Sequence, residues 1–267
     1  MPYMVRPTRS IGWVTNNLER VSGLRPVSSE VTAVANFVLV HGALHGGWCY
    51  SRVARILRAA GHDVFTPTLT GLGERAHLAH MSVNLSLHVE DVAAVLRNEE
   101  LTDVILCGHS YAGMVITGVA AAEGERIRTL VYLDAIVPQD GQSLFDVVGL
   151  ETMQRTVAAA ARDGFVPSPG TAFFNVNAAD SEWVERRCVP QSVATFVEAV
   201  RLTGRERAVR NRTYMFASNY GYALNRGMFD RLGQDPAWRT VTIDAGHDMM
   251  IDAPEELAQA LLQEIGR

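Results

Sequence analysis

Short apolar runs alternate with longer runs of helical spacing along most of the chain. Continuous β-branched and apolar runs predict buried strands, and apolar residues that recur every three or four positions predict helices. Strands are predicted at residues 37–41, 63–67, 104–107, 129–135, 214–217 and 240–244. Helices are predicted at residues 48–60, 85–99, 114–122 and 254–265. This alternation predicts an α/β fold with a mostly parallel sheet and helices on both faces.

The alternation breaks between residues 138 and 205. This stretch reads as helices and loops separated by Gly, Ser and Pro, and it predicts a helical cap inserted after the strand that ends at Asp134. Residues 35–137 and 206–267 are expected to form the α/β core. Residues 1–34 show no periodicity and are expected to form a loosely attached N-terminal extension.

Composition narrows the class of protein. With 267 residues, 48% of them hydrophobic, the chain can bury a large core as one domain. A net charge of −5 without a basic stripe argues against a nucleic-acid partner. Three widely spaced cysteines indicate reduced thiols, and no apolar run approaches the ~18 residues that span a bilayer, so we expect a cytoplasmic protein without a membrane partner. The number of subunits stays open, with a homodimer as one option.

The stretch GHSYAG lies between a predicted strand and a predicted helix and contains Ser110. Gly108 stands two residues before this serine and Ala112 two residues after it, with Gly113 next. This spacing is typical of the G-x-S-x-G nucleophile elbow, in which a strained serine needs small neighbours, although Ala112 replaces the second glycine. The pattern predicts a nucleophile at the N-terminus of a helix; a tight turn whose serine caps the helix is the alternative.

A second motif, VHGALHGGW, follows the first predicted strand. A loop at this position can supply a backbone N–H group that stabilises the oxyanion formed when the serine attacks a carbonyl. The backbone N–H groups of Ala43 and Tyr111 are therefore predicted to form an oxyanion hole. His41 is expected to shape this loop through a hydrogen bond rather than to act in catalysis. His41 and Gly42 are also expected to border the bound substrate.

The candidate base is His247, in the loop after the last predicted strand. A base that follows the nucleophile in the chain is the order expected of this motif set. Of the eight histidines, only this one lies so late in the sequence. Ser110, His247 and two oxyanion amides together predict acyl transfer through an acyl-enzyme.

These motifs resemble the α/β-hydrolase superfamily, in particular the branch that holds hydroxynitrile lyases, plant methylesterases and bacterial esterases. The resemblance rests on VHGALHGGWCY, PTLTGLGERAHL, GHSYAGMVITGVA, LVYLDAIVPQDGQSL and AGHDMMIDAP. It is strongest toward bacterial esterases that cleave pyrethroid esters or methyl carbamates such as carbendazim, and it weakens over residues 150–209. The resemblance implies the α/β-hydrolase fold, the Ser/His pair, the oxyanion hole and hydrolysis without a cofactor.

The sequence offers two candidates for the residue that partners the base. In the resembled branch it usually follows the strand before the last, but here that loop reads SNYGYALN and offers only Asn219. Asp134, at the C-terminal end of a predicted strand, is the alternative, and pancreatic lipases resemble this arrangement. Asp248 adjoins His247 and is not expected to reach its Nδ1, while Asp244 lies on the last strand. Asp134 is therefore predicted as the acid, with Asn219 as a neutral alternative.

Two positions separate a hydrolase from a lyase. The resembled lyases have Thr after the oxyanion-loop His and Lys after the catalytic His, whereas this chain has Gly42 and Asp248. An anionic side chain beside the base would repel cyanide. Hydrolysis of a carboxylic ester or carbamate is therefore predicted, with a C–C lyase or a ligand-binding protein on the same scaffold as alternatives.

The expected substrate is small and apolar or aromatic. Phe173 and Trp183 in the cap, with Met249 near the base, are predicted to line its site, although packing of the cap on the sheet is the alternative use of such residues. No cofactor is expected, because GLGERA matches a dinucleotide fingerprint but lacks the strand before it and a helix directly after it. No metal is expected either, because His77 and His80 lack a third ligand.

Overall fold

A computed structural model describes residues 34–267, so the predicted extension lies outside the described residues except for Val34. Six strands form one sheet in the order β2-β1-β3-β4-β7-β8, and each neighbouring pair is parallel. The strands are β1 Asn36–Val40, β2 Asp63–Phe65, β3 Val104–His109, β4 Ile127–Leu133, β7 Asn211–Ala217 and β8 Trp238–Ile243. The predicted α/β fold with a mostly parallel sheet is confirmed.

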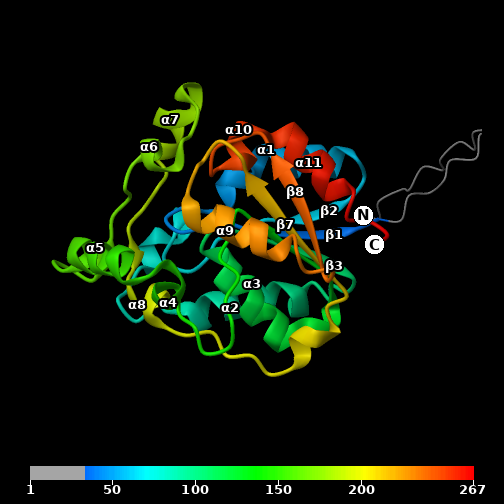
Figure 1. Cartoon of the computed structure of the whole chain (residues 1–267), viewed down its shortest axis with the longest axis horizontal. Helices are drawn as coiled ribbons and strands as arrows, with labels where there is room; N and C mark the ends of the chain where they lie inside the picture. The colour runs from blue at the N-terminus through cyan, green and yellow to red at the C-terminus, as the bar shows by residue number, and fades with distance from the viewer. Residues whose placement is uncertain (1–33) are drawn as a thin grey trace, which may run out of the picture. The chain divides into compact units, whose positions relative to one another are not determined.

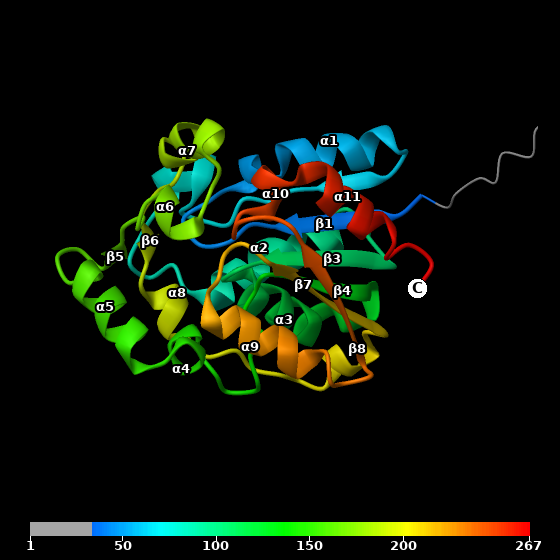
Figure 2. The same ribbon diagram turned by 45° about the horizontal axis from the view of Figure 1, so that its top comes forward.

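Two groups of helices cover the two faces of this sheet (Figures 1 and 2). One group comprises α1 Ser51–Ala59, α10 Met249–Asp252 and α11 Pro254–Leu262. The other comprises α2 Leu85–Asn98, α3 Ala112–Glu123 and α9 Ala223–Leu232. Along β1, Phe37 and Leu39 pack into one core while Val38 and Val40 pack into the other. A strand buried on both faces explains the continuous apolar run seen in the sequence.

The insertion between β4 and β7 lies beside one end of the sheet, and we call residues 138–205 the cap (Figure 1). Its helices are α4 Leu144–Val148, α5 Leu150–Ala160, α6 Thr171–Phe174, α7 Ala178–Glu185 and α8 Ala194–Val197. It also contains a small antiparallel pair, β5 Phe165–Val166 and β6 Gln191–Ser192, which the sequence did not predict. This pair joins the segment that follows α5 to the segment that precedes α8.

The boundaries differ from the prediction in a few places. The helix expected at 48–60 begins as a 3-10 turn, η1 Gly47–Tyr50, and becomes α1 only at Ser51. Helix α9 was not predicted, because its sequence ALNRGMFDRL contains a glycine and only a few apolar residues that reach the core. The other short 3-10 turns are η2 Gly73–Leu78, η3 Gly124–Arg126 and η4 Arg205–Ala208. Within residues 34–267, no helix is both long and apolar enough to cross a membrane.

Candidate active site

Ser110 occupies a sharp turn between β3 and α3. Its φ is 53°, a left-handed conformation that a residue with a side chain adopts at a cost of about 1–2 kcal/mol. The turn is held by the end of the neighbouring strand β4. Ser110 N–H donates to the carbonyl of Leu133 at 3.1 Å, and the Ser110 carbonyl accepts from the backbone N–H of Ile136 at 3.1 Å. These bonds stabilise the strained serine and present its hydroxyl above the sheet.

The small residues around this turn have steric causes. A Cβ on Gly113 would lie 1.8 Å from the carbonyl oxygen of Ile136, and one on Gly108 would lie 2.7 Å from the carbonyl oxygen of Ala112. Neither position can hold a larger residue without movement of the backbone. Ala112 itself fits, and its side chain is fully buried. Gly113 is therefore the glycine required by the close approach of α3 to the segment that follows β4.

Three side chains meet at the C-terminal ends of β3, β4 and β8. Ser110 Oγ lies 2.9 Å from Nε2 of His247, and Nδ1 of the same ring lies 2.6 Å from Oδ2 of Asp134. Because a carboxylate only accepts, Nδ1–H donates to Asp134 and Nε2 is left to accept the serine proton. Asn219, the neutral alternative, instead donates to Asp244 at 2.6 Å. The structure therefore places Asp134, and not Asn219, against the base.

Asp134 is itself held from two directions. The residue has a φ of 45°, and its side chain is buried. Asn225 Nδ2 donates to the Asp134 carboxylate at 2.6 Å and to its backbone carbonyl at 2.9 Å. Ala217 N–H donates to the other carboxylate oxygen at 3.3 Å. The sequence does not single out Asn225, because the helix that carries it, α9, has no clear apolar pattern.

The loop after β1 brings a second backbone amide to the serine. Ala43 and Tyr111 both line the cavity at Ser110, and within residues 34–267 neither backbone N–H donates a hydrogen bond. His41 Nδ1–H donates to the Gly42 carbonyl at 2.8 Å, and its Nε2 accepts from Leu69 N–H at 3.0 Å. Burial lowers the pKa of His41 to about 3, so the ring stays neutral. It orients the peptide unit that carries the Ala43 N–H.

The cap holds the same loop one residue further on. Leu44 has a φ of 69°. Its N–H donates to Oε1 of Gln191 at 2.9 Å, and its carbonyl accepts from Val189 N–H at 2.9 Å. The Gln191 side chain is buried and donates in turn to Thr195 Oγ1 at 2.8 Å. Gln191 and Val189 of the cap therefore hold the N–H and the carbonyl of Leu44. We call this loop after β1, which also carries the Ala43 N–H, the oxyanion loop.

A cavity of about 440 Å³ opens at Ser110 between the sheet and the cap. Its walls are largely apolar and aromatic, which suits a small apolar ligand. The apolar and aromatic lining residues include Leu44, Ile136, Leu144, Phe145, Val148, Val166, Phe173, Phe174, Phe196 and Tyr220. The cationic side chain of Arg155 lies in the same lining, contributed by α5.

Phe173 lines this cavity, whereas four other residues expected to border the substrate do not line it. His41 and Met249 are fully buried in the core. Gly42 faces a neighbouring histidine, since a Cβ on it would lie 2.6 Å from Nδ1 of His109. Trp183 packs edge-on against Trp48, with ring centroids 5.0 Å apart. The expectation that these four residues border the substrate is therefore not met.

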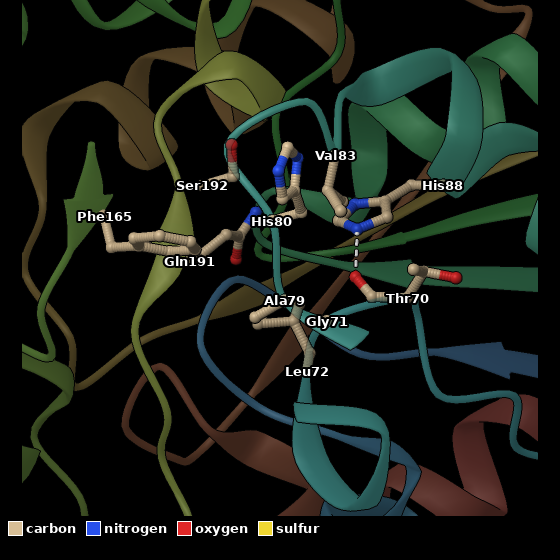
Figure 3. Close-up of a pocket in the computed structure, with 10 residues that line it drawn as sticks. All are labelled: Thr70, Gly71, Leu72, Ala79, His80, Val83, His88, Phe165, Gln191 and Ser192. Carbon is tan, nitrogen blue, oxygen red and sulfur yellow. Dashed lines mark hydrogen bonds between the residues drawn. The ribbon is translucent and has the colours of Figure 1, made fainter. Parts of the chain in front are cut away.

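Figure 3 shows a second, much smaller cavity between α2 and the cap. Its volume is about 10 Å³, room for about one water molecule. At its wall, His88 Nε2–H donates to the Thr70 carbonyl at 2.9 Å (Figure 3). Its Nδ1 accepts from the Tyr111 hydroxyl at 3.0 Å. This histidine therefore holds the side chain of Tyr111, the residue that follows Ser110.

The GLGERA segment itself forms a short 3-10 turn, η2, which begins at Gly73 and ends at Leu78. Asp91 accepts from Thr70 N–H at 2.6 Å and pairs with Arg75 at 3.0 Å, so its carboxylate closes this loop. Within residues 34–267, no group of three or more His, Cys, Asp or Glu side chains is arranged to hold a metal ion.

Asp248 does not face the cavity at Ser110. Its side chain is fully buried and does not line the cavity. Its Oδ2 lies 3.0 Å from Nε2 of His45, which is also buried. The expectation that this carboxylate would repel cyanide is therefore wrong, because its charge is neutralised inside the protein. The position that carries Lys in the resembled lyases still presents no cation here.

A parallel sheet with a serine turn after one strand, a histidine after the last strand and a cap over both defines a class of enzyme. The model of the alpha/beta hydrolase family matches residues 37–260, and the chain belongs to this family. The chain is 46% identical over 238 residues to the carbendazim hydrolyzing esterase of Nocardioides sp. (strain SG-4G), an alignment that covers 85% of this chain and 98% of that protein.

Two further similarities extend this result. The chain is 34% identical over 110 residues to the pyrethroid hydrolase of Sphingobium wenxiniae, covering 40% of this chain and 38% of that protein. Among solved structures, an extracellular alpha/beta-hydrolase from a Paenibacillus species superimposes with a TM-score of 0.73 at 23% identity, over 87% of this chain and 99% of that one. The similarity to the Paenibacillus structure bears on the fold alone.

Proposed function

We propose that this protein is a serine esterase that cleaves a carboxylic ester or a carbamate through an acyl-enzyme. The observation that carries the proposal is the continuous chain of contacts from Ser110 Oγ through His247 to Asp134. Two backbone amides without a partner in residues 34–267 lie beside the same serine, at Ala43 and Tyr111. The similarity to proteins named as an esterase and a hydrolase supports the same reaction class.

Acylation follows from this geometry. His247 Nε2 takes the proton of Ser110 Oγ as the oxygen attacks the carbonyl carbon, and the Ala43 and Tyr111 amides donate to the oxyanion that forms. Asp134 stabilises the imidazolium and keeps Nε2 directed at the serine. The tetrahedral intermediate collapses, and the alcohol leaves with the proton that His247 returns.

Deacylation reuses the same base. His247 takes a proton from a water molecule, whose oxygen attacks the acyl-enzyme, and the second tetrahedral intermediate expels Ser110 Oγ. The proton returns to the serine and the carboxylic acid is released. A carbamate follows the same two steps through a carbamoyl-enzyme.

The apolar walls of the cavity favour a small uncharged substrate with an aromatic or alkyl part. Phe173, Phe174 and Phe196 supply aromatic surface on the cap side. Two relatives are named for hydrolysis of carbendazim and of pyrethroids, and neutral aromatic carbamates and esters of that kind match this lining. A panel of aryl carbamates and alkyl esters is the natural first screen.

The proposal is tested by labelling the purified protein with a fluorophosphonate and mapping the adduct by peptide mass spectrometry. We expect an adduct on Ser110 and hydrolysis of p-nitrophenyl butyrate, with both abolished in folded Ser110→Ala. His247→Ala should label at least about 10³-fold more slowly, because the serine then loses its base. A folded wild-type protein with neither adduct nor turnover would favour the ligand-binding alternative, and cyanide release from mandelonitrile at a comparable rate would favour the lyase.

We further propose that the enzyme works in the cytoplasm. The three cysteines Cys49, Cys107 and Cys188 are free thiols, which supports a reducing compartment.

Light scattering of the purified protein would distinguish a monomer from a homodimer.

A further inference from the structure

A buried ion pair lies behind the candidate active site. His45 Nε2 is 3.0 Å from Oδ2 of Asp248, the side chains are only 1% and 0% exposed, and 203 residues separate them in the chain. Neither residue lines the substrate cavity. A charge pair taken wholly out of water is rarely retained for stability, because its desolvation offsets most of its attraction.

The hydrogen bonds of His45 define its protonation state. Its Nδ1 lies 2.7 Å from the carbonyl oxygen of Ala43, and its Nε2 faces the carboxylate of Asp248. Both partners only accept, so both ring nitrogens carry protons and the ring is an imidazolium. Burial alone would lower the pKa of His45, but the attraction of Asp248 outweighs it and raises this pKa well above its usual value.

The pair joins the two loops that the proposed reaction needs. His45 Nδ1–H is bonded to Ala43, whose own N–H is one of the two proposed oxyanion donors. Asp248 directly follows His247, the proposed base. The His247 backbone is further held at both ends: its N–H donates to the Phe174 carbonyl at 2.9 Å, and its carbonyl accepts from His109 Nε2 at 3.0 Å.

Other groups around the pair do not replace it. His109 Nε2 lies 3.8 Å from Oδ1 of Asp248, but burial first and then the nearby His247 lower the pKa of His109 well below its usual value, so it is neutral. Cys188 Sγ lies 4.0 Å from His45 Nε2, and Trp48 stacks on the ring at 5.3 Å. Among the described residues, His45 is therefore the one cation in contact with the Asp248 carboxylate.

We propose that His45 and Asp248 form a positioning pair that locks the oxyanion loop onto the loop of the base, so that the amide of Ala43 and Nε2 of His247 keep a fixed separation. This inference rests on the proposed esterase function. It assigns a role to the second histidine of HGALHG and to the carboxylate after the base, which the acyl-transfer steps themselves do not use.

The first test is Asp248→Asn, which keeps the size of the side chain and removes its charge. We expect kcat for p-nitrophenyl butyrate to fall about tenfold to 100-fold while KM stays within about twofold, because the transition state depends on the separation of hole and base more than the bound ester does. Glu264→Gln is the matched control. Glu264 is equally buried and ion-paired, with Arg239 and Arg267, but lies away from the cavity, so its loss should lower stability and leave kcat unchanged.

A second variant covers the case in which the lone buried imidazolium prevents folding. In the double variant His45→Gln with Asp248→Asn, the two side chains are neutral and can still hydrogen-bond. If the residues act as one pair, its loss in kcat should equal that of either folded single variant rather than their product. Losses that multiply, or a folded Asp248→Asn enzyme with wild-type kcat, would overturn the positioning role.

Nitrogen-15 NMR of the histidine rings separates failure of this inference from failure of the proposed function. The His45 ring should carry protons on both nitrogens at pH 8 in the wild type and should be neutral in Asp248→Asn, whether or not the protein hydrolyses esters. A neutral His45 in an active wild-type enzyme would reject the ion pair and leave the esterase proposal intact. A wild-type enzyme without turnover but with an imidazolium at His45 would reject the esterase proposal instead.

Discussion

Asp134 Oδ2 lies 2.6 Å from Nδ1 of His247, although 113 residues separate them. If this carboxylate orients and stabilises the imidazolium, Asp134→Asn should lower kcat about 10⁴-fold with little change in KM, because the amide favours the wrong tautomer of the base. Steady-state kinetics with p-nitrophenyl butyrate measure this loss.

Asp244→Asn is the control for that prediction. Asp244 is an exposed carboxylate at the end of β8 and bonds Asn219, which was the neutral alternative for the acid. Its substitution should leave kcat within about twofold. A large loss in Asp244→Asn together with a small loss in Asp134→Asn would reverse the assignment of the acid.

Gly113 and Gly227 should respond in opposite ways to the same substitution. A Cβ on Gly113 would lie 1.8 Å from the Ile136 carbonyl oxygen, whereas one on Gly227, in α9, would meet nothing within 4 Å. Gly113→Ala should therefore reduce the free energy of unfolding by more than about 2 kcal/mol, and Gly227→Ala should increase it by about 0.5–1 kcal/mol. Urea unfolding measures both, and a stable Gly113→Ala protein would show that the elbow tolerates a larger residue.

Acid should destabilise the protein through three buried histidines. Burial lowers the pKa values of His41, His88 and His109 below the usual 6.5, so the folded state keeps these rings neutral while the unfolded chain protonates them. Their contribution to stability is complete above pH 6.5 and is lost as the pH falls below that value, by up to about 1.4 kcal/mol per pH unit for each ring.

His88→Gln isolates one of these rings. A glutamine could keep both partners, donating to the Thr70 carbonyl and accepting from the Tyr111 hydroxyl. The slope of unfolding free energy against pH below pH 6.5 should then decrease, because the variant no longer takes up a proton on unfolding at this position. An unchanged slope, measured by urea unfolding at a series of pH values, would show that His88 does not titrate differently in the two states.

Phe173 should contribute to substrate affinity and Trp183 should not. The Phe173 ring is 51% exposed and lines the cavity, so a bound aromatic ester would cover it. Its replacement by Ala removes ~1 kcal/mol of apolar contact and should raise KM for aryl esters about fivefold at constant kcat. Trp183→Ala should lower stability and leave KM within about twofold, and equal effects on KM would contradict the cavity lining seen here.

Local patterns account for what the sequence could predict. Ser110 and His247 each lie in a short motif whose spacing, strand before and helix after, is visible within a few residues. The acid partner of the base cannot be predicted from a local motif. Its position depends on β4, β7 and β8 lying side by side, and on Asn225, which comes from a helix without a clear pattern. The sequence therefore left Asp134 and Asn219 as competing options until the order of the strands was known.

The ion pair behind the site illustrates the same limit. The sequence places Asp248 directly after His247, which predicts a charge at the active site. In the structure its side chain is buried and contacts His45, which lies 203 positions earlier in the chain. The available signal was its setting, since the carboxylate is followed by Met249 and Met250, which are both buried. A charge in such a run needs a buried counter-charge, but the sequence does not say which residue supplies it.

The bracing of Leu44 by Val189 and Gln191 has a consequence for engineering. Exchange of the whole insertion between two hydrolases, in order to transfer substrate preference, would also exchange the supports of the oxyanion loop. A chimera of that kind would change specificity and turnover together. A crossover confined to residues 144–160 replaces α4 and α5 while leaving both supports, and the pairing of Val166 with Gln191, in place, so that preference can be altered without disturbing the machinery it serves.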